Sequence, residues 1–393
     1  MKYFTFLALI SILAPLNAQA KFSILHYNIK ELDSHKIEMG DHKQVLAVKK
    51  VVNGLAPDFI SLNEIQYDMP GVPTSEQTTK GTNIKNLAKQ IGWTSYPFET
   101  FNPANTGMNA RKKPDGSYYS EASTSRAREH ADQVNFGVFP GQYSTGAISK
   151  FEIIDEKVIT DLKWKDFNPN LDLSPYKLAD GSALPGDMEL FDKNFTDLTV
   201  KIEDKIVHII LLHTVPSFGF GNPHSVNDYR NAEQLRFLQW YLTGKTDYKV
   251  ALNGINSLPE DSYYLAMGDL NVSIYDDESE GQKVLLNTMK IARPWFKTEA
   301  SSFTNESSHY GKNPLRLLLD YILVSPNIQI EQAQIMLPND MSREELGCDQ
   351  KKPQGSHSYR DGNKTCYVKV SEEYETFKTA SDHYPLYGEF SFR

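Results

Sequence analysis

The chain has 393 residues, and its 50 Asp and Glu against 41 Lys and Arg give a formal net charge of −9. This acidic balance excludes a protein that coats nucleic acid through net charge alone, but it leaves room for a cleft in which a bound cation supplies positive charge. With 21 Tyr, 20 Phe and ordinary Gly and Pro contents, the composition indicates a globular, sheet-rich protein of one large domain or two small ones.

Residues 1–20 have the pattern of a secretory signal peptide. One lysine precedes an apolar run, and small residues stand before a cleavage site after Ala20. Pro15 and Asn17 interrupt the run too early for a good membrane span, although a retained anchor is the alternative. We therefore expect a secreted or periplasmic protein whose mature chain starts at Lys21.

The first part of the mature chain indicates a strand, a helix and a second strand. Residues 21–29 have strand composition, residues 42–57 carry apolar residues near a helical period, and residues 58–65 form another short apolar run. A second short helix is expected at 83–91. It lies within a long stretch at about 68–133 that we interpret as a surface insertion.

Strand signals dominate the rest of the chain. The clearest is a hairpin in which "EDK" connects an alternating strand at 195–202 to an apolar strand at 205–214. Residues 226–242 indicate an amphipathic helix. Residues 337–380, which hold both cysteines, are polar and are expected to form a loop. Further strands are expected at 134–139, 144–153, 157–162, 262–267, 314–325 and 386–392.

So many strands, with few helices between them, do not fit one parallel sheet. Two mixed sheets packed face to face, with helices on the outside, fit better. No linker, repeat or low-complexity segment divides the mature chain. We therefore expect residues 21–393 to form a single α+β domain.

Polar side chains stand at or near the ends of several predicted strands. Each has an ordinary structural interpretation, because strand ends are often polar and Asp and Asn close turns. In "MGDLNV", for example, Asp269 and Asn271 either close a turn or point from one side of a strand at a common spot. The number of such residues favours a site, since two packed sheets present their strand ends at a common rim. The set is Asn28, Glu64, His213, Asp269, Asn271, Asp320, Asp382 and His383.

These residue types suit phosphoryl chemistry with a hard cation. Oxygen ligands such as Glu64 favour Mg²⁺ or Mn²⁺, which polarise a phosphoryl oxygen. A histidine with a carboxylate behind it, as we expect for His383, is a general base for water. The chain has no Walker loop, no GxGxxG after its first strand and no GxSxG, so nucleotide-binding and serine-hydrolase interpretations lack their motifs.

Taken in order, the motifs resemble those of the endonuclease/exonuclease/phosphatase superfamily and span nearly the whole mature chain. They are "YNI", "LNEIQ", "LHTVP", "GDLN", "LDYILV" and "SDHYP". This resemblance implies a four-layer αββα sandwich. Within the superfamily, "HTVP" and "SDHYP" resemble the pancreatic-type deoxyribonucleases, which carry two catalytic histidines.

The resemblance implies that Glu64 binds the metal with help from Asn28 and Asp382. The expected ion is Mg²⁺ or Mn²⁺. The deoxyribonucleases have an Arg two residues after the metal-binding Glu, where this chain has Gln66. A fixed cation that faces phosphate is therefore missing at this position.

The resemblance also implies the catalytic roles. His383 is the general base and Asp320 orients it, while Asp269 and Asn271 position the nucleophile or the phosphate. His213 stabilises or protonates the leaving group. The deoxyribonucleases orient this first histidine with a Glu just after a Tyr, whereas no acid follows Tyr143 in this chain.

We expect a secreted, divalent-metal-dependent phosphodiesterase and, in the first place, a nuclease that acts on DNA or RNA. The alternative is a phospholipid or phosphoinositide hydrolase of the sphingomyelinase kind, for which "FGFGNPH" after His213 is a candidate membrane contact. A non-enzymatic scaffold is disfavoured by the complete residue set. No protein partner is indicated, and a monomer is expected.

Two cysteines, Cys348 and Cys366, occur late in the chain. After export they are expected to form a disulfide, with two free thiols as the alternative. Two cysteines without a nearby histidine cluster do not make a zinc site.

Overall fold

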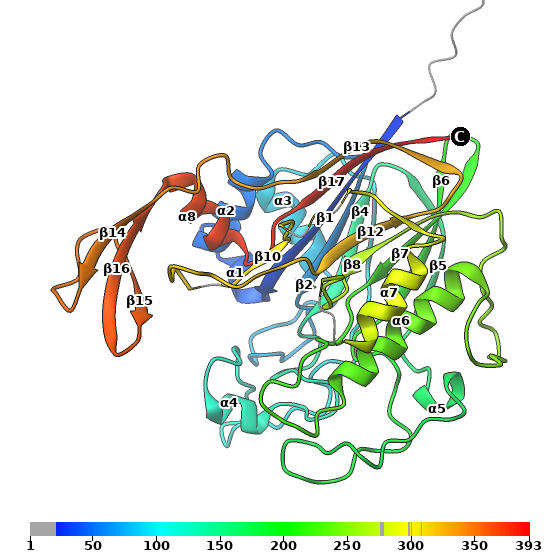
Figure 1. Ribbon diagram of the computed structural model, residues 1–393, viewed down its shortest axis with the longest axis horizontal. Helices are drawn as coiled ribbons and strands as arrows, with labels where there is room; N and C mark the ends of the chain where they lie inside the picture. Colours follow the sequence, from blue (N-terminus) through cyan, green and yellow to red (C-terminus); the bar gives the residue numbers. More distant parts are fainter. Residues whose placement is uncertain (1–20, 276–278, 298, 300, 308) are drawn as a thin grey trace, which may run out of the picture.

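The computed structural model describes residues 21–275, 279–297, 299, 301–307 and 309–393 (Figure 1). The predicted signal peptide, residues 1–20, lies outside these ranges. Within the described ranges, no helix combines the length and the apolar character needed to cross a membrane.

Two six-stranded sheets form the centre of the molecule. Each contains one parallel pair, β1 with β2 and β7 with β8, among antiparallel neighbours, so both sheets are mixed as expected. The first sheet has the order β13 (Ile328–Ile335), β17 (Leu386–Phe392), β1 (Lys21–Leu32), β2 (Phe59–Ile65), β4 (Ser144–Ser149) and β3 (Phe98–Phe101). The second sheet has the order β5 (Glu152–Ile159), β6 (Phe195–Ile202), β7 (Lys205–Leu212), β8 (Tyr263–Asp269), β12 (Asp320–Val324) and β9 (Arg293–Pro294).

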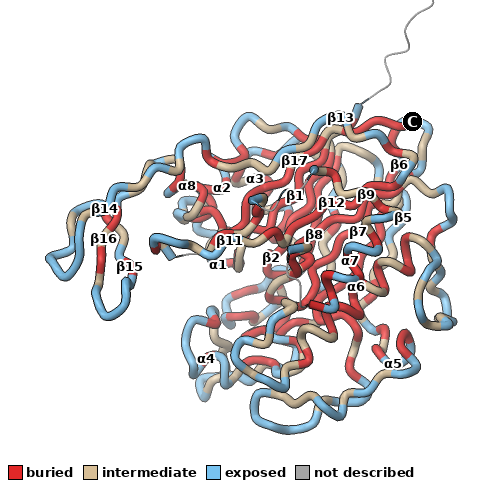
Figure 2. Tube along the Cα trace, viewed as in Figure 1, coloured by how far each residue is buried: buried red, intermediate tan, exposed pale blue. Residues whose placement is uncertain are grey.

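Helices cover the two outer faces of this pair of sheets. The helices on the first sheet share one apolar cluster with it, and those on the second sheet share another. The first group is α1 (Ser34–Glu38), α2 (Lys43–Val51), α3 (Asn83–Ile91) and α8 (Glu372–Ala380). The second group is α5 (Trp164–Phe167), α6 (Asn227–Thr243) and α7 (Glu280–Thr288). The arrangement confirms the predicted four-layer αββα sandwich, whose buried residues concentrate in the two sheets (Figure 2).

Strand β1 illustrates how the sequence builds the layer between the sheets. Its odd-numbered residues, such as Leu25, pack toward the helices, and its even-numbered residues Phe22 and Ile24 enter the core between the sheets. Further along the same inner face come His26 and Asn28, which are also fully buried. The layer between the sheets therefore changes from apolar to polar toward the end of β1.

Strand β2 lies parallel to β1 and repeats this change. Phe59 belongs to the core between the sheets, and Ser61 and Asn63 follow at the next two inner positions. Ser61 Oγ lies 3.1 Å from Nδ1 of His26 on the neighbouring strand. Because parallel strands end at the same edge of a sheet, β1 and β2 present their polar residues side by side.

The prediction that residues 337–380 form a loop is wrong for most of this segment. It contains a three-stranded sheet of β14 (Arg343–Cys348), β16 (Lys364–Val370) and β15 (His357–Asp361), followed by α8. This sheet projects from the sandwich at the left of Figure 1. Cys348 pairs with Cys366 across β14 and β16, and the two are joined by the expected disulfide. A small apolar cluster with Tyr359 and Val368 stabilises the sheet. The segment is polar overall, so its composition did not indicate these strands.

The predicted insertion at 68–133 also needs new boundaries. Helix α3 and strand β3 lie inside that range but belong to the sandwich, where α3 contributes to the apolar cluster under the first sheet. The insertion proper consists of residues 68–82 and 102–142, with α4 (Ser125–His130) in its second part. The strand expected at 134–139 does not form, because Val138 and Phe139 fill a small core of the insertion instead.

One further pair of short strands, β10 (Asn305–Glu306) and β11 (Arg316–Leu317), lies beside the second sheet and holds the segment before β17 in place. The backbone N–H of Glu306 donates to the carbonyl of Asp382 at 2.7 Å. Tyr384 N–H donates to the carbonyl of Thr304, also at 2.7 Å. The segment that carries Asp382 and His383 is therefore fixed from both sides.

Candidate active site

Glu64 occupies a bulge in β2. The pairing register of β2 shifts around it against both neighbouring strands, and its φ angle of 63° is left-handed. A bulge re-aims the side chains around it, so that consecutive residues can serve one site. The oxygen Oδ1 of Asn63 accepts a hydrogen bond from Asp269 N at 3.0 Å, and Oε1 of Glu64 accepts one from Asn28 Nδ2 at 3.0 Å.

Asp269 is the last residue of β8, and its two carboxylate oxygens have different partners. Oδ1 accepts the backbone N–H of Asn271 at 2.8 Å, which closes a turn. Oδ2 accepts Asn28 Nδ2 at 3.1 Å and lies 3.6 Å from Nε2 of His213. The motif "GDLN" therefore forms a turn through one oxygen and directs the other toward the remaining site residues.

His383 and Asp320 come together from opposite sheets. Nδ1 of His383 lies 2.7 Å from Oδ2 of Asp320, and its Nε2 lies 3.7 Å from Oδ2 of Asp269. A histidine that the sequence analysis missed, His26, approaches the other oxygen of Asp320 with its Nε2 at 3.4 Å. Asp320 is thus a fully buried carboxylate between two imidazoles.

Electrostatics follow from this burial. Burial lowers the pKa of His383, but the charges of Asp320 and Asp269 more than offset it and raise that pKa to about 10. Burial raises the pKa of Asp320, but the charge of His383, the close approach of His26 and the hydrogen bond from His383 reverse this effect and hold the pKa of Asp320 well below its usual range. For Asp269, burial together with the charges of Asp320 and Glu64 raises the pKa to about 7.

His213 has a different environment. Burial first, and then the charges of Lys193 and His383, lower the pKa of His213 well below its usual value. Its Nδ1 atom has no hydrogen-bond partner among the described residues, although the backbone of Tyr143 acts on the pKa in the opposite direction. The imidazole of His213 is therefore neutral, and among the described residues no acidic side chain bonds to its Nδ1.

Asp382, expected as a metal ligand, forms an ion pair in this structure. Its Oδ2 accepts Nζ of Lys30 at 2.5 Å. Burial lowers the pKa of Lys30, but the neighbouring Asp382, Glu64 and Glu31 more than offset it and raise the pKa. Lys30 thus places a cation next to the carboxylates of the site, a position that the sequence pattern did not indicate.

Strained backbone is concentrated around these side chains. Among the described non-glycine residues, eight have positive φ, and five of the eight lie here. They are Lys30 (46°), Glu31 (45°), Glu64 (63°), Tyr143 (67°) and Asn271 (50°). Left-handed non-glycine residues persist where the surrounding structure over-determines them, and functional sites are where they cluster.

The donor set fits a hard divalent cation. Candidate ligand atoms of Glu64, His213 and Asp269 lie within 4.8 Å of one another, as do those of Asp269, Asp320 and His383. Burial, and then the charge of Asp382, raise the pKa of Glu64, which means that negative charge at the site is incompletely compensated. Carboxylate and amide oxygens in such a setting suit Mg²⁺ or Mn²⁺.

Helix α6 holds the loops of the site in place, which its amphipathic pattern did not predict. Asn231 donates through Nδ2 to Oγ1 of Thr214 at 3.0 Å and to the carbonyls of Val215 at 2.7 Å and Leu270 at 3.0 Å. Oε1 of Gln234 accepts the N–H of Val215 at 2.8 Å. The polar residues of α6 that are buried are Arg230, Asn231, Glu233 and Gln234. Among them, Asn231 joins the loop after His213 to the loop after Asp269.

The sandwich and this site define a phosphoester-hydrolysing class of protein, and comparison with known proteins gives its family. The model of the Endonuclease/Exonuclease/phosphatase family matches residues 27–383. The chain therefore belongs to this family and is a hydrolase that acts on phosphoester bonds. A search of curated protein sequences found no match.

Solved structures resemble this chain at low sequence identity. An endonuclease/exonuclease/phosphatase from Beutenbergia cavernae is 14% identical with a TM-score of 0.51, and the match covers 95% of this chain and 72% of that chain. TDP2 from D. rerio, complexed with a single-strand DNA product, is 13% identical with a TM-score of 0.47, covering 95% and 99%. Sphingomyelinase C from Streptomyces griseocarneus is 14% identical with a TM-score of 0.44, covering 94% and 99%.

Proposed function

We propose that this phosphoester hydrolase is a secreted, divalent-metal-dependent nuclease that cleaves phosphodiester bonds of DNA or RNA. The observation that supports the proposal is the convergence of Asn28, Glu64, Asp269 and the His383–Asp320 pair at adjoining strand ends of the two sheets. Secretion rests on the pattern of residues 1–20.

Glu64, with Asn28 and Asp382, would hold the cation, which supplies Lewis-acid polarisation of a phosphoryl oxygen when bound. To bind the cation, Asp382 must give up its ion pair with Lys30. The geometry suits such an exchange, because Lys30 is partly exposed and its long side chain can turn toward the substrate phosphate.

The chain's own residues account for the proton movements. Asp320 accepts the Nδ1–H of His383, and a bound cation would lower the raised pKa of His383, so that its deprotonated Nε2 can take a proton from the attacking water. Oδ2 of Asp269 lies on the same side and orients that water. As the water oxygen bonds to phosphorus and the bond to the leaving oxygen breaks, the neutral His213 stabilises the leaving oxygen by a hydrogen bond. This role suits its low pKa better than protonation does.

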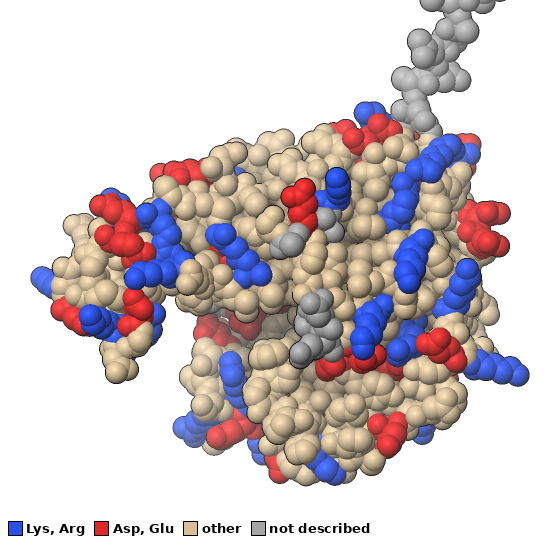
Figure 3. Space-filling view, viewed as in Figure 1, with Lys and Arg blue, Asp and Glu red and all other residues tan. Residues whose placement is uncertain are grey.

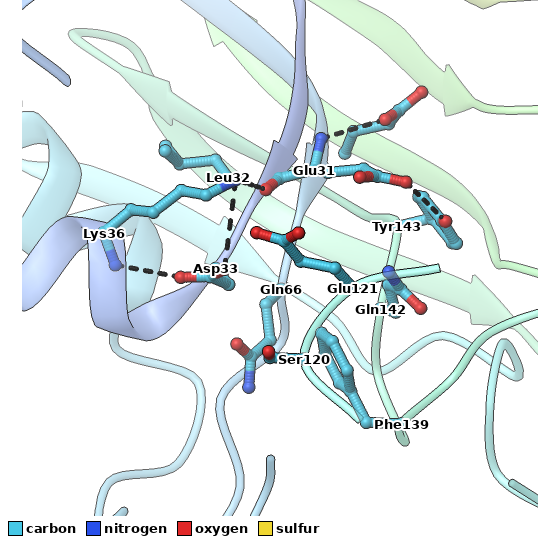
Figure 4. Close-up of a pocket in the computed structure, with 11 residues that line it drawn as sticks. Glu31, Leu32, Asp33, Lys36, Gln66, Ser120, Glu121, Phe139, Gln142 and Tyr143 are labelled. Carbon is cyan, nitrogen blue, oxygen red and sulfur yellow. Dashed lines mark hydrogen bonds and ion pairs between the residues drawn. The ribbon is translucent and has the colours of Figure 1, made fainter. Parts of the chain in front are cut away.

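A cavity next to Glu64 favours polar substituents on the phosphate. Its walls include Glu31, Tyr143, Gln142 and, from the insertion, Glu121 (Figure 4). The hydroxyl of Tyr143 donates to Oε1 of Glu31 at 2.8 Å. The cavity has room for about one water molecule, so a sugar or another polar group would hydrogen-bond to its polar rim without entering it, whereas an acyl chain would leave these polar groups unpaired.

A second candidate function, hydrolysis of a phospholipid, is favoured by the loop after His213. Phe218 and Phe220 are 62% and 68% exposed, and their rings contact each other edge to face at 5.0 Å between centroids. Ser217 anchors this loop beside the site, since its N–H and Oγ both bond to the carbonyl of Asn271. Exposed aromatic rings at a catalytic rim suit an interfacial lipid substrate.

A substrate panel separates the two functions. Purified mature protein is incubated with DNA, RNA, sphingomyelin and a phosphomonoester, each with Mg²⁺, Mn²⁺ or a chelator, and the variant His383→Ala is the matched control. Cleavage of DNA or RNA that His383→Ala lacks supports the nuclease. Cleavage of sphingomyelin alone would replace it by the lipid hydrolase. N-terminal sequencing of exported protein tests cleavage after Ala20.

A further inference from the structure

The site lacks an arginine where the deoxyribonucleases have one. Gln66, which stands at that position, has its side chain engaged in structural hydrogen bonds. Gln66 is buried, its Oε1 accepts the N–H of Ser34 at 2.9 Å, and its Nε2 donates to the carbonyl of Val72 at 3.0 Å. Gln66 therefore fastens the start of the insertion to the sandwich. Besides Lys30, any further cation for the substrate phosphate has to come from another part of the chain.

The insertion brings Arg128 to the rim of the cavity. Nε of Arg128 donates to the carbonyl of Ala122 at 2.9 Å, next to Glu121 in the cavity wall. Burial raises the pKa of Tyr143, which also lines the cavity, and the charge of the nearby Arg128 acts on that pKa in the opposite direction. Across the described part of the chain, Arg128 forms no ion pair, so its outer nitrogens remain available for an anion.

Two lysines continue the positive charge along the insertion. Nζ of Lys112 lies 5.2 Å from the ring centroid of Tyr118, and Nζ of Lys113 lies 5.5 Å from that of Tyr119. The residue after these tyrosines, Ser120, lines the cavity. The rings hold the two ammonium groups in place, which lowers the entropy lost when they bind an anion.

The charge balance of this segment differs from that of the whole chain. Between residues 108 and 131 five basic residues stand against three acidic ones, although the chain as a whole has an excess of acids. The acids are Asp115, which lies 3.8 Å from Lys113, Glu121 in the cavity wall, and Glu129. Figure 3 shows charged side chains of both signs on the lower left, where α4 lies.

The cavity itself repels a further phosphate. Its walls carry the carboxylates of Glu31, Asp33, Glu64 and Glu121 against one cation, Lys36 (Figure 4). A chain of phosphates that reaches the catalytic residues must therefore leave over the rim, and Arg128 stands at that rim.

From these contacts we propose that the insertion is a substrate-binding element, on which Arg128 binds the phosphate at the cleavage site and Lys112 and Lys113 bind the following phosphates of a nucleic-acid strand. The proposal rests on the proposed nuclease function and names the surface that such a substrate uses. Several cations along one segment can each bind one phosphate of a nucleic-acid backbone. Proteins usually bind single strands through such positive charges along the backbone.

Three variants test the proposal against one control. Arg128→Gln removes the cation at the rim, with Arg128→Lys as its conservative partner, and the double variant Lys112→Gln/Lys113→Gln removes the outer pair. The control is Lys245→Gln/Lys249→Gln, an equal loss of charge at exposed positions after α6. Binding of a fluorescein-labelled oligothymidine is measured by anisotropy in chelator over a range of salt, and turnover is measured on the oligonucleotide and on bis(p-nitrophenyl) phosphate.

The two classes of variant have different expected results. Lys112→Gln/Lys113→Gln weakens oligonucleotide binding roughly tenfold at low salt and reduces the salt slope by about 1.4, because two phosphate contacts are lost. Its turnover of the small diester stays at the parent level. Arg128→Gln lowers kcat/KM for both substrates, and Arg128→Lys restores part of it.

The proposal fails if all insertion variants bind and cleave the oligonucleotide as the control does. That outcome leaves the nuclease function standing, because the parent still cleaves. A parent that neither binds nor cleaves oligonucleotide overturns both. Binding of vesicles containing phosphatidylserine that depends on Lys112 and Lys113, without oligonucleotide binding, would assign the insertion to a membrane surface and overturn the proposal as well.

Discussion

The imidazole of His383 and the carboxylate of Asp320 form a buried hydrogen bond of 2.7 Å between Nδ1 and Oδ2 that joins the two sheets of the sandwich. The first prediction follows from it. His383→Ala should lower turnover about 100-fold or more, because it removes the general base, and Asp320→Asn should lower it strongly, because the tautomer is no longer fixed. Steady-state kinetics on any substrate that the parent cleaves provides the measurement.

Circular dichroism is the control for this prediction, since both residues are buried. The variants should keep the parent spectrum. Near-parent activity of a folded His383→Ala would show that another group removes the proton from water.

The second prediction concerns the protonation of His383 in metal-free protein. Burial lowers its pKa, but Asp320 and Asp269 raise it to about 10, so the imidazole should stay protonated from pH 6 to beyond pH 8. Asp320→Asn removes the largest opposing charge and should bring the pKa down by several units toward or below the ordinary value of about 6.5. NMR titration of the imidazole C2 proton, in chelator, measures both values.

The same shift fixes the sign of a stability effect. The folded-state pKa of His383 is raised, so its contribution to stability is complete below about pH 6.5 and is lost as pH rises toward 10. The free energy of unfolding of metal-free parent should therefore fall relative to His383→Gln between these values, by on the order of 1 kcal/mol per pH unit. A parallel pH dependence for parent and variant would contradict the assigned protonation.

The sequence predicted which side chains come together where strand ends and motifs coincide. Glu64 and Asp269 both accept a hydrogen bond from Asn28, since alternation along β1 and the ends of β2 and β8 place the three residues at a common edge. His213 and His383 lie within 4 Å of the same Asp269 oxygen. Strand periodicity was sufficient for these residues because the sandwich aligns the ends of its central strands.

The residues that were missed have no periodic signal. Lys30 reaches Asp382 through a left-handed backbone that no strand pattern encodes. Asn231 and Gln234 lie on a helix that was predicted from its apolar residues alone. Their buried side chains hydrogen-bond to loops, which the apolar pattern does not indicate. Arg128 depends on the path of the insertion, which tertiary contacts determine.

The third prediction concerns Gly268, the glycine of "GDLN". A Cβ atom on Gly268 would lie 1.6 Å from the carbonyl oxygen of Leu212 on the neighbouring strand, so no side chain fits there. Gly268→Ala should lower the free energy of unfolding by more than about 3 kcal/mol or prevent folding. Gly186→Ala is the matched control, because a Cβ there meets nothing within 4 Å, and it should stay within about 0.5 kcal/mol of the parent in urea denaturation. Equal stability of the two variants would mean that β7 and β8 lie farther apart than described.

The fourth prediction separates the metal from the fold. The apolar clusters on both sides of the sandwich do not involve Glu64, Asn28 or Asp382, so removal of the cation should leave circular dichroism unchanged. The free energy of unfolding should fall only by the binding contribution, about 2.7 kcal/mol at one hundred times Kd, and the melting temperature should fall only by the corresponding amount. Turnover, by contrast, should disappear with chelator and return with Mg²⁺ or Mn²⁺, because the ammonium group of Lys30 does not supply the Lewis-acid polarisation of a phosphoryl oxygen.

Glu64→Gln provides the readout that does not depend on activity. Isothermal titration calorimetry with Mn²⁺ should show one site in the parent and an affinity at least tenfold lower in Glu64→Gln, since the variant loses one of the two carboxylates among the three predicted ligands and keeps its shape. Ser61→Ala, which alters a buried neighbour of His26 without touching a predicted ligand, should bind Mn²⁺ like the parent. Undiminished hydrolysis by protein that elemental analysis finds free of metal would reject the cation-dependent mechanism. His383, Asp320 and Lys30 would then have to stabilise the transition state alone.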